Sequence, residues 1–94
     1  MTPREILKDL EDLAVRLGVT IRYERLSDGE TEVGSGLFSH KGKKSLLIDQ
    51  ALDIEGRVGV CLREFKLLDL SDVYIKPYLR SLLDDSRGRP NFSQ

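Results

Sequence analysis

The fold is decided by residues 2–24, TPREILKDLEDLAVRLGVTIRYE, where a helical hydrophobic period gives way to strict alternation. Thr2, Pro3 and Glu5 form the pattern of a capping box with a proline in the first turn. Gly18 supplies the left-handed conformation that commonly ends a helix. Between these signals the apolar residues recur at helical spacing: Ile6, Leu7, Leu10, Leu13, Ala14 and Leu17. We therefore expect an amphipathic helix over residues 3–17.

The next segments are typical of strands and turns. Val19, Ile21 and Tyr23 alternate with polar residues, which predicts a half-buried strand. The expected order is a strand over 19–26, a turn at SDGE (27–30), a weaker glycine-containing strand over 31–40, a turn at KGKK (41–44) and a short strand over 45–49. Because short loops usually join neighbouring strands, we expect a three-stranded antiparallel meander.

The second half of the chain predicts two helices. Asp53 stands in the N-cap position of the first, whose apolar residues follow a helical period: Ile54, Val58, Cys61, Leu62, Phe65 and Leu68. Gly56 and Gly59 each lower helix propensity by about 1 kcal/mol relative to alanine, so packing must hold this helix. Pro77 starts a short last helix. We expect a single domain over residues 1–84 and a flexible, polar tail over 85–94.

Together these elements predict an α+β fold with an N-terminal helix, a three-stranded antiparallel sheet, a longer helix and a short C-terminal helix. The expected core is Ile6, Leu10, Leu13, Leu17, Val19, Ile21, Tyr23, Leu37, Leu47, Val58, Cys61, Leu62, Phe65, Leu79 and Leu82. A sheet covered on one face leaves other apolar residues exposed, such as Phe38, Leu46 or Ile48. A second copy of the chain or a partner protein could cover them.

The composition indicates a small soluble protein of the cytoplasm. The 94 residues suit one domain, and 15 basic against 16 acidic side chains give a net charge of −1. The overall basic excess of a dedicated nucleic-acid binder is therefore missing. A single cysteine allows no intrachain disulfide, which fits a reducing compartment. The chain also lacks a signal-peptide pattern and any apolar run near the roughly 20 residues that span a bilayer.

Few residues are available for catalysis or for binding a metal. One histidine and one cysteine cannot supply the usual ligand set of a zinc site. Cys61 lies on an apolar helix stripe, where a cysteine typically packs as a small hydrophobe. Gly34 and Gly36 lack the third glycine and the following helix of a dinucleotide motif. We expect no enzymatic activity, no cofactor and no metal.

The turn at HKGKK, residues 40–44, is the remaining candidate site. Its basic side chains are those of His40, Lys41, Lys43 and Lys44. Together with Arg87 and Arg89 of the tail, they could contact phosphates of a nucleic acid or another anion. Lysine and glycine are equally ordinary in a hairpin loop, where lysine deters edge-to-edge pairing. We favour the hairpin and keep anion or nucleic-acid binding as the alternative.

The first helix is followed by LGVTIRYERL (17–26), GLFSHKGKKSLLID (36–49) and QALDIEGRVGVCLREF (50–65). Over residues 4–66 this order resembles the N-terminal half of the ImmA/IrrE-type zinc metallopeptidases. In that family a helix and a short antiparallel sheet precede a helix that bears His-Glu-x-x-His. Here Cys61, Leu62 and Phe65 stand in place of the first histidine, the glutamate and the second histidine, so metal-activated water cannot form. The resemblance implies a non-catalytic relative in which these positions are core residues.

The expected function follows from two observations: the sequence lacks catalytic motifs, and the predicted sheet leaves apolar residues uncovered on one face. We expect a non-enzymatic module that binds a protein partner or a second copy of itself. The alternative is a binder of anions or nucleic acid that uses the basic turn Lys41–Lys44. An enzyme built on His40 or a carboxylate is the least favoured hypothesis.

Overall fold

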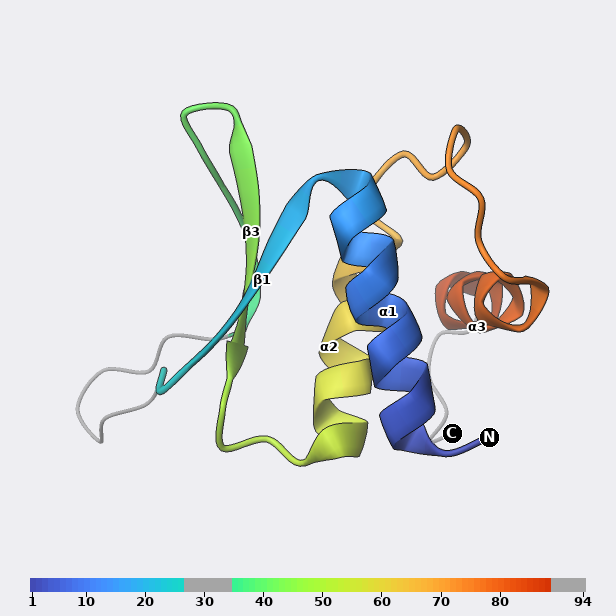
Figure 1. Cartoon of the computed structure of the whole chain (residues 1–94), viewed down its shortest axis with the longest axis horizontal. Helices are drawn as coiled ribbons and strands as arrows, with labels where there is room; N and C mark the ends of the chain where they lie inside the picture. The colour runs from blue at the N-terminus through green and yellow to red at the C-terminus, as the bar shows by residue number, and fades with distance from the viewer. Residues whose placement is uncertain (27–34, 89–94) are drawn as a thin grey trace.

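The computed structural model describes residues 1–26 and 35–88 (Figure 1). Its elements are α1 (Pro3–Leu17), β1 (Val19–Glu24), β2 (Gly36–His40), β3 (Lys43–Asp49), α2 (Ile54–Phe65) and α3 (Pro77–Gly88). The α+β class is confirmed. The turn predicted at 27–30 and the start of the strand predicted over 31–40 lie outside the described residues. Residues 85–88 of the predicted tail form the end of α3.

Helix α1 begins and ends at the predicted residues. The Thr2 hydroxyl accepts a hydrogen bond from the Glu5 backbone N–H at 3.2 Å, and the Glu5 carboxylate accepts one from the Thr2 backbone N–H at 2.9 Å. The bond from the Thr2 backbone lowers the pKa of the Glu5 carboxyl, because it favours the charged form. Gly18 ends the helix with a φ of 75°. The capping box and the glycine therefore set both ends of α1.

The sheet is mixed and has the strand order β1-β3-β2. β2 and β3 form an antiparallel hairpin, whereas β1 pairs with β3 in parallel. The predicted antiparallel meander is therefore wrong in its strand order and in the direction of one pair. A two-residue loop forces β2 to lie beside β3. Residues 25–35 separate β1 from β2, and a connection of that length lets β2 take the far edge of the sheet.

The hydrophobic side chains of β3 decide which of its faces packs against the helices. Leu46 and Ile48 are fully buried and face α1 and α2. Leu47 was expected in the core, but it is only half-buried and points to the opposite face. Side chains alternate along a strand, so β3 can turn either Leu47 or the pair Leu46 and Ile48 inward. Burying the pair removes more apolar surface from water.

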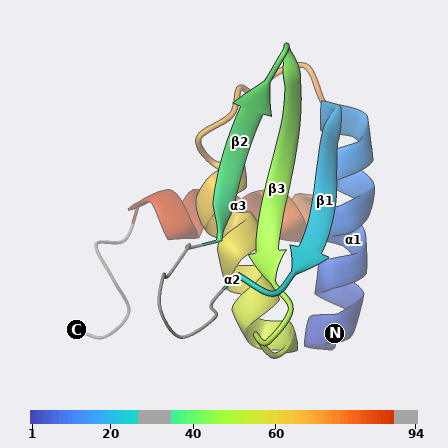
Figure 2. The same ribbon diagram turned by 90° about the vertical axis from the view of Figure 1, so that its left-hand side faces the viewer.

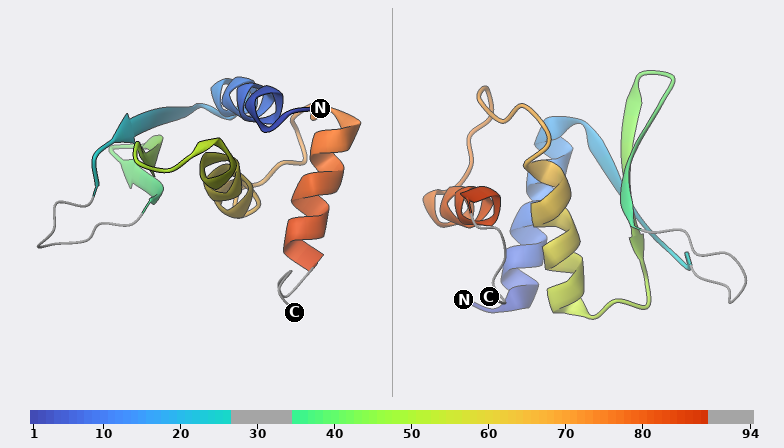
Figure 3. Two further views of the ribbon diagram at one scale, coloured as in Figure 1. Left: turned by 90° about the horizontal axis from the view of Figure 1, so that it is seen from below. Right: turned by 180° about the vertical axis from the view of Figure 1, so that it is seen from behind.

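Three layers make up the described part of the chain. Helices α1 and α2 pack side by side on one face of the sheet, and α3 packs on the far side of α2 (Figures 1 and 3). One continuous core joins the layers: its buried members are Leu7, Leu10, Leu13, Ala14, Val19, Leu46, Ile48, Val60, Cys61, Phe65, Ile75, Leu79 and Leu83. The other predicted core residues, apart from Leu47, are partly buried against it: Ile6, Leu17, Ile21, Tyr23, Leu37, Val58, Leu62 and Leu82.

Helix α2 contains two glycines in different surroundings. The Asp53 side chain accepts a hydrogen bond from the Gly56 N–H at 2.8 Å, which confirms Asp53 as the N-cap. A Cβ at Gly56 would lie 3.1 Å from the Asp53 carboxylate and 3.3 Å from Leu52 Cβ. A Cβ at Gly59 would meet no atom within 4 Å. A side chain at position 56 would therefore crowd Asp53 and Leu52, whereas position 59 has room for one.

We predict that Gly59→Ala stabilises the protein. Alanine gains up to about 1 kcal/mol of helix propensity over glycine at an unobstructed position. A gain of that size raises the melting temperature by about 4–8 °C in a domain of this length. Thermal unfolding followed by circular dichroism measures it.

Gly18→Ala is the matched control. It makes the same chemical change at a residue with a φ of 75°, where a Cβ is strained. This variant should melt below the wild type. A Gly59→Ala variant that also melts lower would contradict the assignment of Gly59 as a free helical position.

Candidate functional site

The hairpin between β2 and β3 carries the four residues that the sequence suggested as a site. Lys41 and Gly42 have φ values of 54° and 80°, and a two-residue type I′ turn requires two positive values. His40 and Lys43 form the last pair of the register. The hairpin prediction is confirmed, although β3 begins at Lys43 and the turn is shorter than KGKK.

The basic side chains of this hairpin point in different directions. His40 and Lys43 lie on one face of the sheet, because residues paired across strands share a face. Lys44 belongs to the other face and pairs with Val19, while Lys41 lies at the tip. All four are exposed, at an end of the sheet that stands away from the helices (Figure 1). The structure concentrates these groups at one end but does not bring them together as one cradle.

The sheet surface opposite α1 and α2 forms a second candidate site, which we call the open face. It consists of Thr20, Arg22, Glu24, Gly36, Phe38, His40, Lys43, Ser45, Leu47 and Asp49. Figure 2 looks onto this face, with the helices behind it. Within residues 1–26 and 35–88, no helix or strand covers it.

The middle of the open face is its apolar part. Phe38 keeps 44% of its surface exposed, although it belongs to a strand. Leu47 lies on the neighbouring strand, opposite Gly36, so no side chain of β2 shields it at that position. Phe38 pairs across the strands with Ser45, which in turn pairs with Thr20, and both of these residues have short side chains. An apolar surface, formed by Phe38 and Leu47 and surrounded by short side chains, therefore lies between the two charged ends of the sheet.

Charge on the open face changes sign from one end to the other. His40 and Lys43 lie at the hairpin end. Glu24 and Asp49 pair with each other at the opposite end. Arg22 lies one row inside that acidic end, and its guanidinium bridges to Glu24 at 2.6 Å. The face is therefore basic at one end, apolar in the middle and acidic, with one internal ion pair, at the other.

Side chains of α2 occupy part of the outer edge of β2. The Leu37 backbone N–H donates to the Glu64 carboxylate at 3.3 Å. The Arg63 guanidinium donates to the Ser35 carbonyl at 3.0 Å and pairs with Glu64 at 2.7 Å. These contacts use backbone groups that another strand would need for pairing. The face of the sheet is therefore more accessible to a partner than this edge.

Two tyrosine–carboxylate hydrogen bonds connect α1 to the other layers. The Tyr23 hydroxyl donates to Glu11 at 2.5 Å, and the Tyr78 hydroxyl donates to Asp9 at 2.5 Å. Lys76 adds an ion pair to Asp9 at 3.1 Å. Burial, followed by the bonds to the carboxylates, raises the pKa of both tyrosines, whereas the Tyr78 bond, followed by that of Lys76, lowers the pKa of Asp9. These interactions stabilise the packing of α1 against β1 and α3.

Cys61 occupies the core as the sequence predicts. Its side chain is fully buried, and burial raises the pKa of the thiol to about 12. The neutral thiol is a poor nucleophile. Phe65 is fully buried as well, and Leu62 packs partly against the core. Cys61 and Phe65 are therefore core residues of α2, whereas Leu62 lies at the margin of the core.

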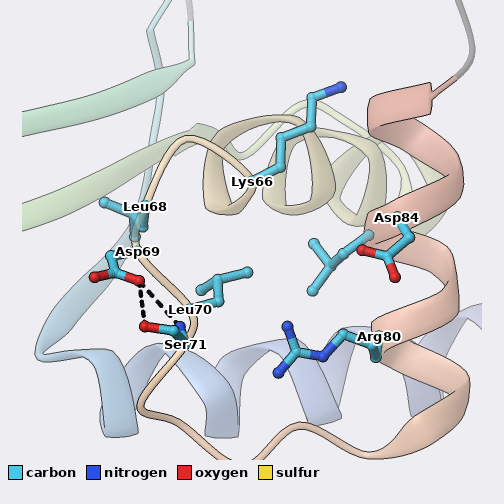
Figure 4. Close-up of a pocket in the computed structure, with 8 residues that line it drawn as sticks. Lys66, Leu68, Asp69, Leu70, Ser71, Arg80 and Asp84 are labelled. Atoms are coloured by element: carbon cyan, nitrogen blue, oxygen red, sulfur yellow. Dashed lines mark hydrogen bonds between the residues drawn. The ribbon is translucent and has the colours of Figure 1, made fainter.

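A pocket between the end of α2, the following loop and α3 is a third candidate site (Figure 4). Its volume is about 270 Å³. Leu70 and Leu83 provide apolar walls, and Lys66 and Arg80 provide positive charge. In Figure 4 the Arg80 side chain extends from α3 across the opening toward the loop. No residue spacing signals this pocket in advance, because its residues come from segments that only the packing of α3 brings together.

The loop side of this pocket is held by an aspartate. The Asp69 carboxylate accepts hydrogen bonds from the Ser71 hydroxyl at 2.7 Å and from the Ser71 backbone N–H at 3.0 Å (Figure 4). Both bonds lower the pKa of Asp69, with the hydroxyl as the larger cause. These two hydrogen bonds fix the conformation of the loop that faces Arg80.

The described residues contain no cluster of three or more potential metal ligands. In the same part of the chain, no helix has the length and apolar character needed to cross a membrane. No protein-family model, curated protein or solved structure matches the chain. The resemblance to the ImmA/IrrE-type metallopeptidases stays a prediction.

We predict that Tyr78→Phe destabilises the protein in a pH-dependent way. Its hydrogen bond to an ionised carboxylate is worth about 1.5–3 kcal/mol at neutral pH. Since the folded pKa of Asp9 is lowered from 3.8, this stabilisation is present above that value and is lost as pH falls through the lowered pKa. Urea unfolding between about pH 6 and pH 2 measures the difference from wild type.

Tyr74→Phe is the control for this experiment. Tyr74 is 67% exposed, and its hydroxyl makes no hydrogen bond among the described residues. Its removal should change stability little at any pH. A Tyr78→Phe deficit that stays constant down to about pH 2 would show that the bond to Asp9 is not its cause.

Proposed function

We propose that the chain is a non-enzymatic, cytoplasmic interaction module that associates with a second copy of itself through the open face. The observation that carries this proposal is the graded charge of that face around an exposed apolar middle. Phe38 and Leu47 supply the apolar part, while Lys43 and Asp49 mark the two ends. A surface of this kind is complementary to itself when one copy is reversed.

The reversed arrangement follows from a two-fold axis that lies between the copies and runs across the strands. Such an axis places β3 over β3 of the second copy with opposite direction. Lys43 then lies over Asp49 of the second copy, and the reverse pair forms at the other end. Stacked sheets lie about 10 Å apart, which suits an interface filled by Phe38 and Leu47.

The size of the face sets the expected affinity. From Lys43 to Asp49 the face runs about 20 Å along β3, and it is three strands wide. This surface is smaller than the roughly 800 Å² per partner of a standard stable interface. We therefore expect weak association, with a dissociation constant between about 1 µM and 1 mM.

Support for a non-enzymatic role comes from the core. The cysteine is neutral and buried, and the positions aligned with the metallopeptidase helix hold Cys61, Leu62 and Phe65. We therefore include in the proposal that any kinship with that family is with a non-catalytic relative. The single cysteine also suits a reducing compartment.

Binding of anions by the hairpin tip is a second candidate function. Lys41 and Lys44 are exposed there and do not belong to the open face, so they can be changed without altering the proposed interface. Phosphate contacts by such side chains would bind nucleic acid without reading its sequence.

We predict that Phe38→Glu disrupts the dimer. A charge in the apolar middle should raise the dissociation constant at least about tenfold, as expected when a central aromatic anchor is removed. Sedimentation velocity over a concentration series measures it. Leu67→Glu is the matched control, because Leu67 is 70% exposed and lies outside the open face, and it should leave the dissociation constant unchanged. A wild-type protein that stays monomeric up to about 1 mM would refute the proposal.

Anion binding by the hairpin tip can be tested separately from self-association. If it binds nucleic acid, a Lys41→Glu, Lys44→Glu double variant should bind a short fluorescent single-stranded RNA more weakly at low salt. The slope of log affinity against log salt should become shallower by about 0.7 for each phosphate that the variant no longer neutralises. Fluorescence anisotropy measures both quantities. Equal binding by this variant and the wild type, or no binding by the wild type at low salt, would remove the second candidate.

A further inference from the structure

The pocket between α2 and α3 contains a guanidinium for which the described residues supply no hydrogen-bond acceptor. Arg80 is only partly exposed and lines the pocket. Its guanidinium makes no hydrogen bond or ion pair with the described residues. A guanidinium has five N–H donors in a rigid plane, and at the partly exposed Arg80 a ligand can take the place of water on these donors. An incoming group with two coplanar oxygens would satisfy them.

We propose that this pocket binds a small aliphatic carboxylate, with Arg80 as the group that holds its oxygens. Carboxylates match the guanidinium fork with two parallel hydrogen bonds. In Figure 4 the Arg80 side chain extends from α3 toward the loop that carries Leu70 and Ser71, so its guanidinium faces the space between them. The backbone of Arg80 is fixed by helical hydrogen bonding, because its N–H donates to the Lys76 carbonyl at 2.9 Å.

The charges that line the pocket limit the ligand to a monoanion. Lys66 and Arg80 are balanced by Asp69 and Asp84, which gives a lining close to neutral. The negative charges of Asp69 and Asp84 in this lining disfavour a second negative charge on the ligand. A phosphate or a dicarboxylate would therefore lose more by repulsion than a monocarboxylate.

The apolar walls define the remainder of the ligand. Leu70 is half-buried, and Leu83 is only 2% exposed, so both present methyl groups to the pocket without being free to leave it. Leu68 lines the same side. A volume of about 270 Å³ accommodates a short chain. A chain of a few carbons attached to the carboxylate would replace water at these walls.

This site is independent of the proposed self-association. The pocket lies at the α3 end of the described part of the chain, and the open face lies on the far side of the sheet (Figure 3). Loss of ligand binding would leave the dimer interface intact, and a monomeric variant would keep the pocket.

Titration of the protein with butyrate, followed in amide NMR spectra, tests the proposal. We expect saturable shifts confined to residues 66–71 and 80–84 at millimolar butyrate. Arg80→Gln should weaken binding at least tenfold, and Arg80→Lys, which keeps the charge and loses the planar fork, should weaken it several-fold. Arg25→Gln is the matched control, because Arg25 is exposed and lies beyond the end of β1, and its binding should equal that of the wild type. A dispersed amide spectrum of each variant shows that it is folded.

Three further probes separate a carboxylate site from simpler explanations. Butanol, which has the chain without the charge, and inorganic phosphate, which has the charge without the chain, should each bind at least tenfold more weakly than butyrate. Acetate should bind more weakly than butyrate because it leaves the leucine walls uncovered. Equal binding of phosphate and butyrate, or butyrate binding that survives Arg80→Gln, would overturn the proposal.

Discussion

The alternation of side chains along β3 is the constraint on which the rest of the structure depends. β3 lies at the centre of the sheet, between β1 and β2, and turns Leu46 and Ile48 toward the helices. The same choice turns Leu47 outward and leaves it beside Phe38. Because β2 is joined to β3 by a two-residue turn, its outward residues follow this register. The open face is therefore a consequence of how the core is filled.

The helical layers are held to this sheet by hydrophobic packing and by a few side-chain hydrogen bonds. Helix α1 carries both carboxylate partners of the tyrosine hydrogen bonds, Glu11 toward β1 and Asp9 toward α3. Helix α2 packs between the sheet and α3, and its Glu64 reaches the edge of β2. Helix α2 thus supplies the side chains that occupy the outer edge of β2, whereas the Arg80 pocket is lined by Lys66, the loop after it and α3.

The sequence predicted local features well because their causes are local. The capping box at Thr2, the stop at Gly18, the cap at Asp53 and the hairpin each depend on residues a few positions apart. The strand order could not be predicted in this way. Nothing in residues 25–35 specifies which side of β3 receives β2, and the choice between Leu47 and its two neighbours depends on the packing of both helices.

The candidate sites also divide into a part that the local sequence predicts and a part that depends on tertiary packing. The basic residues of the hairpin were visible in the sequence, but their division between two faces depends on the register. Arg80 carried no signal, since its importance comes from the way α3 packs beside the loop after α2.

Association of two open faces in reversed orientation is tested most directly by an isotope-filtered NOE experiment on an equal mixture of labelled and unlabelled chains. We expect NOEs between copies that involve the Phe38 ring and the Leu47 methyl groups and none that involve Leu67. NOEs between copies that involve Leu67 or Val15 and omit Phe38, or no such NOEs at millimolar protein, would contradict this mode of association.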